Sequence, residues 1–85
     1  MSYYAYMAVC ADKTIYSGYT ADPKRREAEH NSGHGAKYTR CRLPVKIVYY
    51  EECQTKSEAM KREAAFKKLD RLQKLEMIAG FKKEE

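Results

Sequence analysis

Two tyrosines on neighbouring predicted strands form the first group of side chains that could carry chemistry. Tyr6 lies in the stretch Tyr3–Cys10 and Tyr16 in Thr14–Tyr19, and both stretches are rich in residues that favour strands. If the two rings share a face of the sheet, they could line a space that a ligand approaches. The alternative is that both rings are ordinary core aromatics with their hydroxyls at the edge of the core.

The turn between the two strands decides whether the tyrosines share a face of the sheet. A two-residue loop at Asp12–Lys13 would place the rings on opposite faces. A three-residue loop, Ala11–Lys13, pairs Tyr6 with Gly18 and leaves Tyr16 as a diagonal neighbour of Tyr6. We predict the three-residue loop, in which the missing side chain of Gly18 opens space beside Tyr6.

The helix expected after Asp22–Pro23 carries two further candidates. It runs to about Asn31 with almost no large apolar residues, so burial of an apolar face does not explain it. Arg26 and His30 lie one turn apart, and on a face turned toward the tyrosines they would bring a permanent cation and a titratable imidazole to one place. The planar guanidinium of Arg26 suits a phosphate. The alternative is a solvated helix on which Arg26 pairs with a nearby carboxylate.

Glu63 is the most informative acidic residue. Ala59 lies one turn before it and Phe66 one turn after it, so the carboxylate falls on the apolar stripe of its helix. A charge in that position needs a partner. The partner is either a divalent cation, which prefers oxygen ligands, or the ammonium group of Lys67 one turn further on.

A positive charge excess suggests a polyanionic partner. Seventeen Lys and Arg residues against twelve Asp and Glu give a formal net charge of +5. Charge alone is equally compatible with a solvated surface, so the interpretation depends on where the basic residues lie. The residues we expect to contact nucleic acid follow a glycine-rich break or lie on the helix of Glu63; they are Lys37, Tyr38, Arg40, Arg42, Lys61 and Arg62.

Cysteine usage and hydropathy favour a cytoplasmic protein. The three cysteines form no Cys-x-x-Cys pair, which argues against a disulfide framework or a four-cysteine zinc site. His30, His34 and Cys41 offer zinc ligands only across a glycine-containing loop, and we do not favour that site. No apolar run approaches the roughly 18 to 20 residues that a membrane helix needs, so no membrane association is expected.

The expected elements fit one domain of residues 1–85, with a core of about 3–79 and a frayed tail at 80–85. The order is β-β-α-(short α)-β-α-α, which is an α/β (α+β) arrangement. The third strand spans Val45–Tyr50, where β-forming residues follow Pro44. Ser57 is expected to cap a helix to about Leu69, and Asp70 to cap a last helix through Ala79.

The residues and their spacing resemble the GIY-YIG nuclease domain, in its small stand-alone bacterial branch. Tyr4-Ala5-Tyr6 and Tyr16-Ser17-Gly18 are similar to the two tripeptides that name this family. The likeness covers Tyr3 to about Ile78, and it includes an arginine ten residues after the second tyrosine and a glutamate on a late helix.

The resemblance implies a three-stranded antiparallel sheet flanked by helices, with a nuclease site on one side of the sheet. By position it implies catalytic roles for Tyr6, Tyr16, Arg26 and His30, and it makes Glu63 the ligand of one Mg²⁺ or Mn²⁺ ion. The implied reaction is hydrolysis of DNA phosphodiester bonds by a monomer or weak homodimer, with repair or recombination as the expected setting and RNA as an alternative substrate. A non-catalytic nucleic-acid-binding module and a protein-interaction domain remain as alternatives.

The sequence departs from the family pattern on the first helix. Glu27 stands where an apolar residue is expected, which predicts that this helix packs loosely against the sheet.

Overall fold

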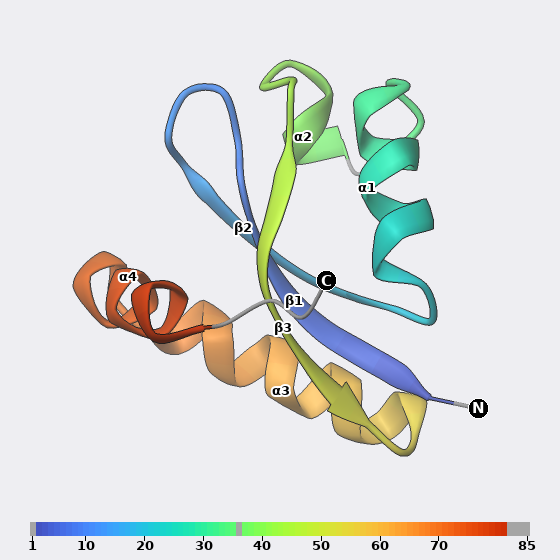
Figure 1. The fold of residues 1–85 in the computed structure, drawn as a ribbon, viewed down its shortest axis with the longest axis vertical. Helices are drawn as coiled ribbons and strands as arrows, with labels where there is room; N and C mark the ends of the chain where they lie inside the picture. The colour runs from blue at the N-terminus through green and yellow to red at the C-terminus, as the bar shows by residue number, and fades with distance from the viewer. Residues whose placement is uncertain (1, 36, 82–85) are drawn as a thin grey trace.

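The computed structural model describes residues 2–35 and 37–81. Its elements are β1 (Tyr3–Val9), β2 (Ile15–Thr20), α1 (Pro23–Asn31), α2 (Lys37–Arg40), β3 (Lys46–Cys53), α3 (Lys56–Lys68) and α4 (Arg71–Gly80). The strands form one antiparallel sheet in the order β2-β1-β3. Figure 1 shows this sheet running diagonally through the molecule, with helices on both sides. The predicted element order and fold class are confirmed.

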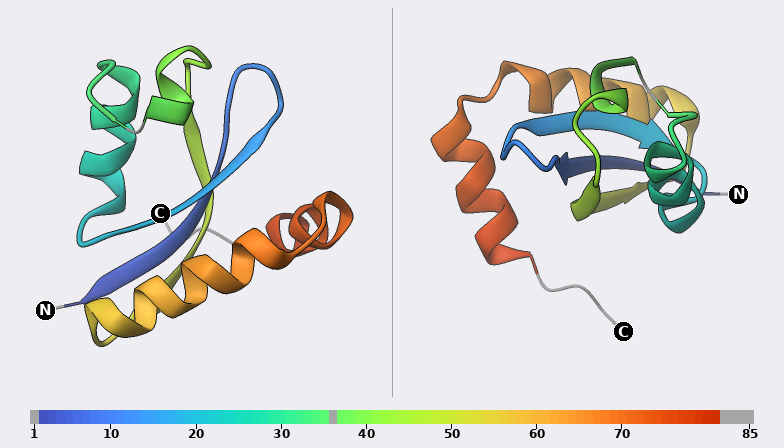
Figure 2. Two further views of the ribbon diagram at one scale, coloured as in Figure 1. Left: turned by 180° about the vertical axis from the view of Figure 1, so that it is seen from behind. Right: turned by 90° about the horizontal axis from the view of Figure 1, so that it is seen from above.

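Two apolar layers form on the two faces of the sheet because successive strand residues point to opposite sides. One face carries the buried Tyr6, Ala8 and Ile47 and is covered by α1 and α2. The other carries Ala5 and Met7, which pack against Phe66 of α3, together with partly buried residues of α4. Figure 2 shows the two helix pairs separated by the sheet. The molecule is therefore a three-layer domain with β1 at its centre.

The predicted hairpin register is confirmed. Tyr6 pairs with Gly18 and Ala8 with Tyr16. The three-residue loop closes with a bond from the Cys10 amide to the Thr14 carbonyl at 2.9 Å. Lys13 takes a left-handed conformation with φ of 70°, and no glycine is needed there because a neighbouring aspartate, Asp12, accepts bonds from both the amide and the hydroxyl of Thr14.

The polar helix α1 is held against β3 by hydrogen bonds. The Glu27 carboxylate accepts the amide of Ile47 at 2.7 Å. The Asn31 side chain both accepts the Val45 amide, at 2.6 Å, and donates to the Val45 carbonyl, at 2.9 Å. The prediction of loose packing from Glu27 was therefore wrong: because β3 is an edge strand, its outer backbone groups need polar partners, and α1 supplies them.

The helix starts follow their capping residues, with one correction. Asp22 caps α1 and Asp70 caps α4, each accepting a backbone amide, as predicted. The cap of α3 is Thr55 rather than Ser57, because the Thr55 hydroxyl already accepts the Glu58 amide at 3.1 Å and the helix begins at Lys56.

The C-terminal helix turns back onto the sheet. Gly80 is the last residue of α4, and the ring of Phe81 then packs between Tyr49 and Tyr50 with centroid distances of 5.1 and 5.0 Å. The rest of the predicted tail, residues 82–85, lies outside the described residues. Within the described part of the chain, no helix has both the length and the apolar character needed to cross a membrane.

Candidate active site

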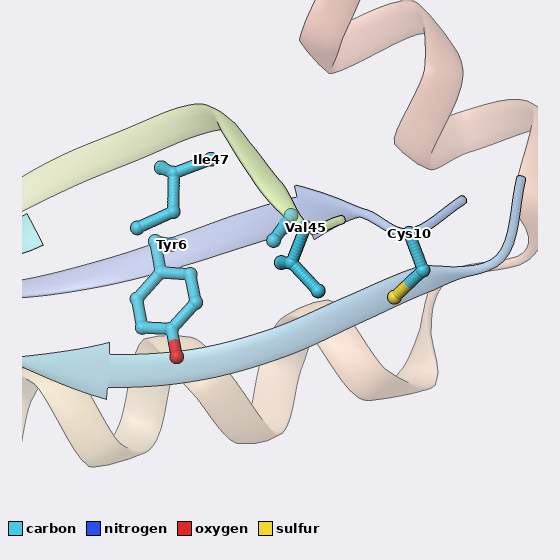
Figure 3. Packing of buried hydrophobic residues seen from close by; sticks show 5 residues of the cluster. Tyr6, Cys10, Val45 and Ile47 are labelled. Carbon is cyan, nitrogen blue, oxygen red and sulfur yellow. The ribbon is translucent and has the colours of Figure 1, made fainter. Parts of the chain in front are cut away.

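Tyr6 reaches from the central strand across β2. Its ring is fully buried, and Gly18 provides the space for it: a Cβ on Gly18 would stand 2.6 Å from the Tyr6 hydroxyl oxygen and 2.8 Å from Cζ. Figure 3 shows the ring extending over the β2 ribbon, with its hydroxyl on the side away from Ile47. The pairing of Tyr6 with a glycine thus brings a phenol from the middle of the sheet to the β2 edge.

The Tyr6 hydroxyl contacts the imidazole of His30. Its oxygen lies 2.9 Å from Nε2, while Nδ1 of the same ring lies 2.8 Å from the hydroxyl of Thr39. His30 and Thr39 are both fully buried. Burial lowers the pKa of His30 below its ordinary value, and the charge of Arg26 lowers it further. The imidazole is therefore neutral at pH 7 and links the two hydroxyls.

Arg26 lies close enough to the same hydroxyl for the two groups to influence each other's pKa. Burial is the largest influence on its pKa and acts to lower it, but the interaction with Tyr6 and the charge of Glu29 together raise it. The Glu29 carboxylate lies 3.7 Å from the guanidinium, and 28% of the Arg26 side chain remains exposed. Both sequence interpretations of Arg26 thus hold in part, since it pairs with a carboxylate and still faces the tyrosines.

Tyr16 completes the aromatic part of the site. Its ring centroid lies 6.4 Å from that of Tyr6 and 5.6 Å from that of His30. The ring of Tyr38 stacks on Tyr16 at 5.7 Å with an interplanar angle of 25°. Unlike Tyr6, Tyr16 is only half-buried. It is the tyrosine of the pair that solvent or a bound molecule can reach.

Arg42 holds Tyr38 in place. Its guanidinium carbon lies 4.1 Å from the Tyr38 ring centroid, and Nη1 donates to the Tyr38 carbonyl at 2.7 Å. The guanidinium also pairs with Asp12 in the hairpin turn at 3.0 Å. Arg42 therefore links the hairpin, α2 and the ring that supports Tyr16.

Glu63 approaches the cluster from α3. Its carboxylate is 18% exposed and accepts an ion pair from Lys67 at 2.8 Å, which is one of the two partners that the sequence left open. The negative charge of Glu63 contributes to raising the pKa of Tyr6. The tyrosines, Arg26, His30 and Glu63 are thus brought to one region of the molecule by four different elements.

The predicted nucleic-acid contacts fall into two groups. Lys37, Arg40 and Lys61 are exposed. Arg42 is engaged with Tyr38, and Arg62 forms a two-bond ion pair with Glu51 of β3 at 2.8 and 3.0 Å. The structure therefore does not bring Arg62 to the tyrosine cluster at the β2 edge.

Two residues of this cluster were not predicted. Thr39 supplies the second contact of His30, and its only signal in the sequence is a place in the short basic helix. A Cβ on Gly35 would collide with Nδ1, Cα and Cγ of His30. A glycine five residues after a histidine carries no local sign of that contact.

The side chains of this cluster fit a metal ion that takes most of its ligands from water and from the substrate. No three His, Cys, Asp or Glu side chains among residues 2–35 and 37–81 are grouped so that they could hold a metal ion. Both ring nitrogens of His30 face hydroxyls, which leaves none for zinc. Glu63 offers one partly exposed carboxylate. Mg²⁺ is commonly held through one or two carboxylates together with water and substrate phosphates, so a single glutamate is compatible with it.

Comparison with known proteins connects this site to a family. Residues 2–76 match the family described as the GIY-YIG catalytic domain. A UPF0213 protein of Streptococcus pyogenes serotype M5 is 57% identical over 82 residues, which span 95% of this chain and 89% of that protein. The solution NMR structure of a UPF0213 protein from Bacillus halodurans is 42% identical with a TM-score of 0.58, and the match covers 93% of this chain and 84% of that one. The solution NMR structure of an E. faecalis protein is 47% identical with a TM-score of 0.59, covering 100% and 94%.

Proposed function

Because this chain belongs to the GIY-YIG catalytic domain family, we propose that it is a divalent-metal-dependent endonuclease that hydrolyses DNA phosphodiester bonds. The observation that carries the proposal is that Tyr6 contacts His30 directly, while Arg26 and Glu63 lie close enough to act, after burial, on the pKa of Tyr6. A permanent cation can bind a phosphate and a carboxylate can bind a metal ion, and the half-buried Tyr16 beside Tyr6 is the phenol that a water molecule can reach.

Arg26 binds the phosphate in this proposal. Its guanidinium remains charged at any pH where the protein is folded, and its exposed part can donate to two phosphate oxygens at once. As a water oxygen bonds to phosphorus and one ester P–O bond breaks, negative charge grows on the phosphate oxygens and the interaction with Arg26 strengthens.

Glu63 would hold one Mg²⁺ or Mn²⁺ ion. The ion would neutralise charge on the phosphate and on the departing oxygen. Lys67 pairs with Oε1 of Glu63, so it would either shift or share the carboxylate with a bound ion. The Lys67 side chain is 57% exposed and so has room to move, whereas the Glu63 side chain is only 18% exposed.

We assign to Tyr16 the role of orienting or deprotonating the attacking water. Burial is the main reason that the pKa of Tyr6 is raised, to about 12, so Tyr6 stays protonated and is poorly suited to remove a proton. It is also closed off from solvent. Tyr16 is half-buried and is backed by Tyr38. Tyr6 and the neutral His30 then act as positioning residues that orient Arg26.

The exposed basic residues Lys37, Arg40 and Lys61 supply affinity for the DNA backbone, because such contacts need only positive charge.

A non-catalytic nucleic-acid-binding module is the second candidate. The observation in its favour is the Lys67 ammonium on Glu63, the one carboxylate assigned to the ion. Both candidates predict binding that weakens with salt, so metal dependence separates them.

The test is nicking of supercoiled plasmid with and without Mg²⁺ or Mn²⁺. Glu63→Gln and Arg26→Ala should each remove metal-dependent nicking, by about a hundredfold or more in rate. The matched controls are Glu76→Gln and Arg25→Ala, which delete the same charges from exposed positions on α4 and α1 and should nick like the parent. Binding without cleavage in any metal would establish the binding module instead, and undiminished cleavage by Glu63→Gln would remove Glu63 from the mechanism.

A further inference from the structure

A pocket of about 310 Å³ lies between the start of α1 and strands β1 and β3. None of the proposed catalytic residues lines it. It is on the same face of the sheet as Tyr6, because Tyr4, which lines the pocket, stands two residues before Tyr6 on β1. The two positions are about 6.6 Å apart along the strand, a separation that one nucleotide of an extended chain can span.

The apolar walls of the pocket are aromatic. Tyr4 and Tyr50 meet edge to face, with ring centroids 5.7 Å apart at 86°. Ile47, which is 3% exposed, forms the floor, and Pro23 closes the side toward α1. Flat aromatic and aliphatic walls in a space of this volume favour a planar ring as the occupant.

The polar lining offers acceptors and one cation. The Glu27 carboxylate binds the Ile47 amide through Oε2, and the Asp22 carboxylate binds the Arg25 amide through Oδ1. Among the described residues, no partner is found for the second oxygen of either carboxylate. Lys24, which is exposed, also lines the pocket. The lining therefore combines carboxylate acceptors with one lysine, which suits a ring that bears an amino group and is attached to a phosphate.

We propose that this pocket binds one unpaired DNA base that carries an exocyclic amino group, next to the phosphate held at Arg26. This inference rests on the proposed function for the position of that phosphate. Cytosine presents its N4 amino group to a carboxylate, whereas thymine presents only a carbonyl oxygen at that position and is rejected. A paired base is excluded because its amino group is engaged with the opposite strand, so the pocket selects DNA in which a base is free.

Binding is measured without metal, so that cleavage is not needed for the result. Three labelled duplexes of otherwise identical sequence carry a single bulged cytosine, a single bulged thymine or no bulge, and their dissociation constants are compared by fluorescence anisotropy in EDTA. The parent protein should bind the cytosine bulge about tenfold more tightly than the other two, the effect of one hydrogen bond to a charged group.

The Glu27→Gln variant tests the proposed base preference most directly. The glutamine carbonyl can still accept the Ile47 amide, while its NH₂ group replaces the unpartnered acceptor by a donor, so the preference should shift from cytosine toward thymine. Tyr50→Leu should lower affinity for the cytosine bulge about tenfold through lost stacking. Glu76→Gln is the charge-matched control and should behave like the parent.

If the parent protein binds all three duplexes with equal affinity, that result alone overturns the pocket assignment. A cytosine preference that survives in Glu27→Gln, with the variant shown to be folded by circular dichroism, would do the same. A cytosine preference in a protein that cleaves nothing in Mg²⁺ or Mn²⁺ would support the pocket and refute the nuclease proposal, so the two failures are distinguishable.

Discussion

Gly18→Ala tests the geometry on which the whole site depends. The added methyl group would stand 2.6 Å from the Tyr6 hydroxyl oxygen, 2.8 Å from its Cζ and 3.1 Å from Cε2 of Tyr16. All three distances are below an ordinary van der Waals contact, and Tyr6 is fully buried in a close-packed interior. The substitution must therefore displace the Tyr6 ring and separate its hydroxyl from His30.

The expected loss of stability is about 2 to 4 kcal/mol. Overpacking a well-filled core costs about 1 to 3 kcal/mol, and a lost hydrogen bond between buried groups adds about 1 kcal/mol. This is a substantial part of the roughly 5 to 15 kcal/mol by which a small domain is stable. Nicking should fall as well, because Arg26 is oriented by the same hydroxyl.

The measurement is urea unfolding of the parent, Gly18→Ala, Tyr6→Phe and the double variant. Gly80→Ala is the control: nothing lies within 4 Å of a Cβ there, and alanine should leave the helix unchanged or stabilise it by up to about 1 kcal/mol. Since Tyr6→Phe removes the atom nearest the added methyl group, the double variant should be less destabilised than the sum of the single ones by about 1 kcal/mol. A Gly18→Ala protein within about 0.5 kcal/mol of the parent would refute the reasoning.

Three further predictions concern the surroundings of the site. Burial and then the charge of Arg26 hold the pKa of His30 below 6.5, so His30 gains its proton in the unfolded chain before it does in the folded one as the pH falls. The free energy of unfolding should therefore decrease below pH 6.5 by up to about 1.4 kcal/mol per pH unit. Urea unfolding of His30→Gln should lack this decrease. Tyr38→Leu should lower the nicking rate at saturating DNA more than it weakens binding, whereas Tyr38→Phe, which keeps the ring stacked on Tyr16, should nick normally. Asn31→Leu should destabilise the domain by about 2 to 3 kcal/mol in thermal unfolding, since it leaves both backbone groups of Val45 unpaired.

Much of the fold could be predicted because local signals decide it. The alternation of β-forming residues, the caps at Asp22 and Asp70 and the three-residue turn each act over a few positions. The exceptions arise where two local signals compete or where distant backbone intervenes. Thr55 and Ser57 can both cap a helix, so the sequence alone does not decide between them. Glu27 stands at a position where an apolar residue was expected, because the Ile47 amide that it binds is 20 residues away in the sequence.

The candidate site divides in the same way. Strand register and helix spacing could place Tyr6 and Tyr16 on one face and Arg26 on the following helix, whereas their catalytic roles came from the resemblance to the family. The contact of Thr39 with His30 could not be read from local pattern, since it depends on how α2 folds back over α1. Arg42 and Arg62 were assigned to DNA by charge alone, but their partners Asp12 and Glu51 become visible only when the hairpin and β3 are placed beside them.

The side chains of α1 on the edge of β3 also bear on the behaviour of this domain in a crowded solution. An exposed edge strand is a template on which another chain can add a strand, and such additions lead to aggregation. Glu27 and Asn31 already hydrogen-bond the Ile47 amide and both backbone groups of Val45. These groups are therefore not available to pair with an incoming strand at the start of β3. Although α1 buries little apolar surface, its hydrogen bonds cover this part of the β3 edge, which would hinder strand addition there.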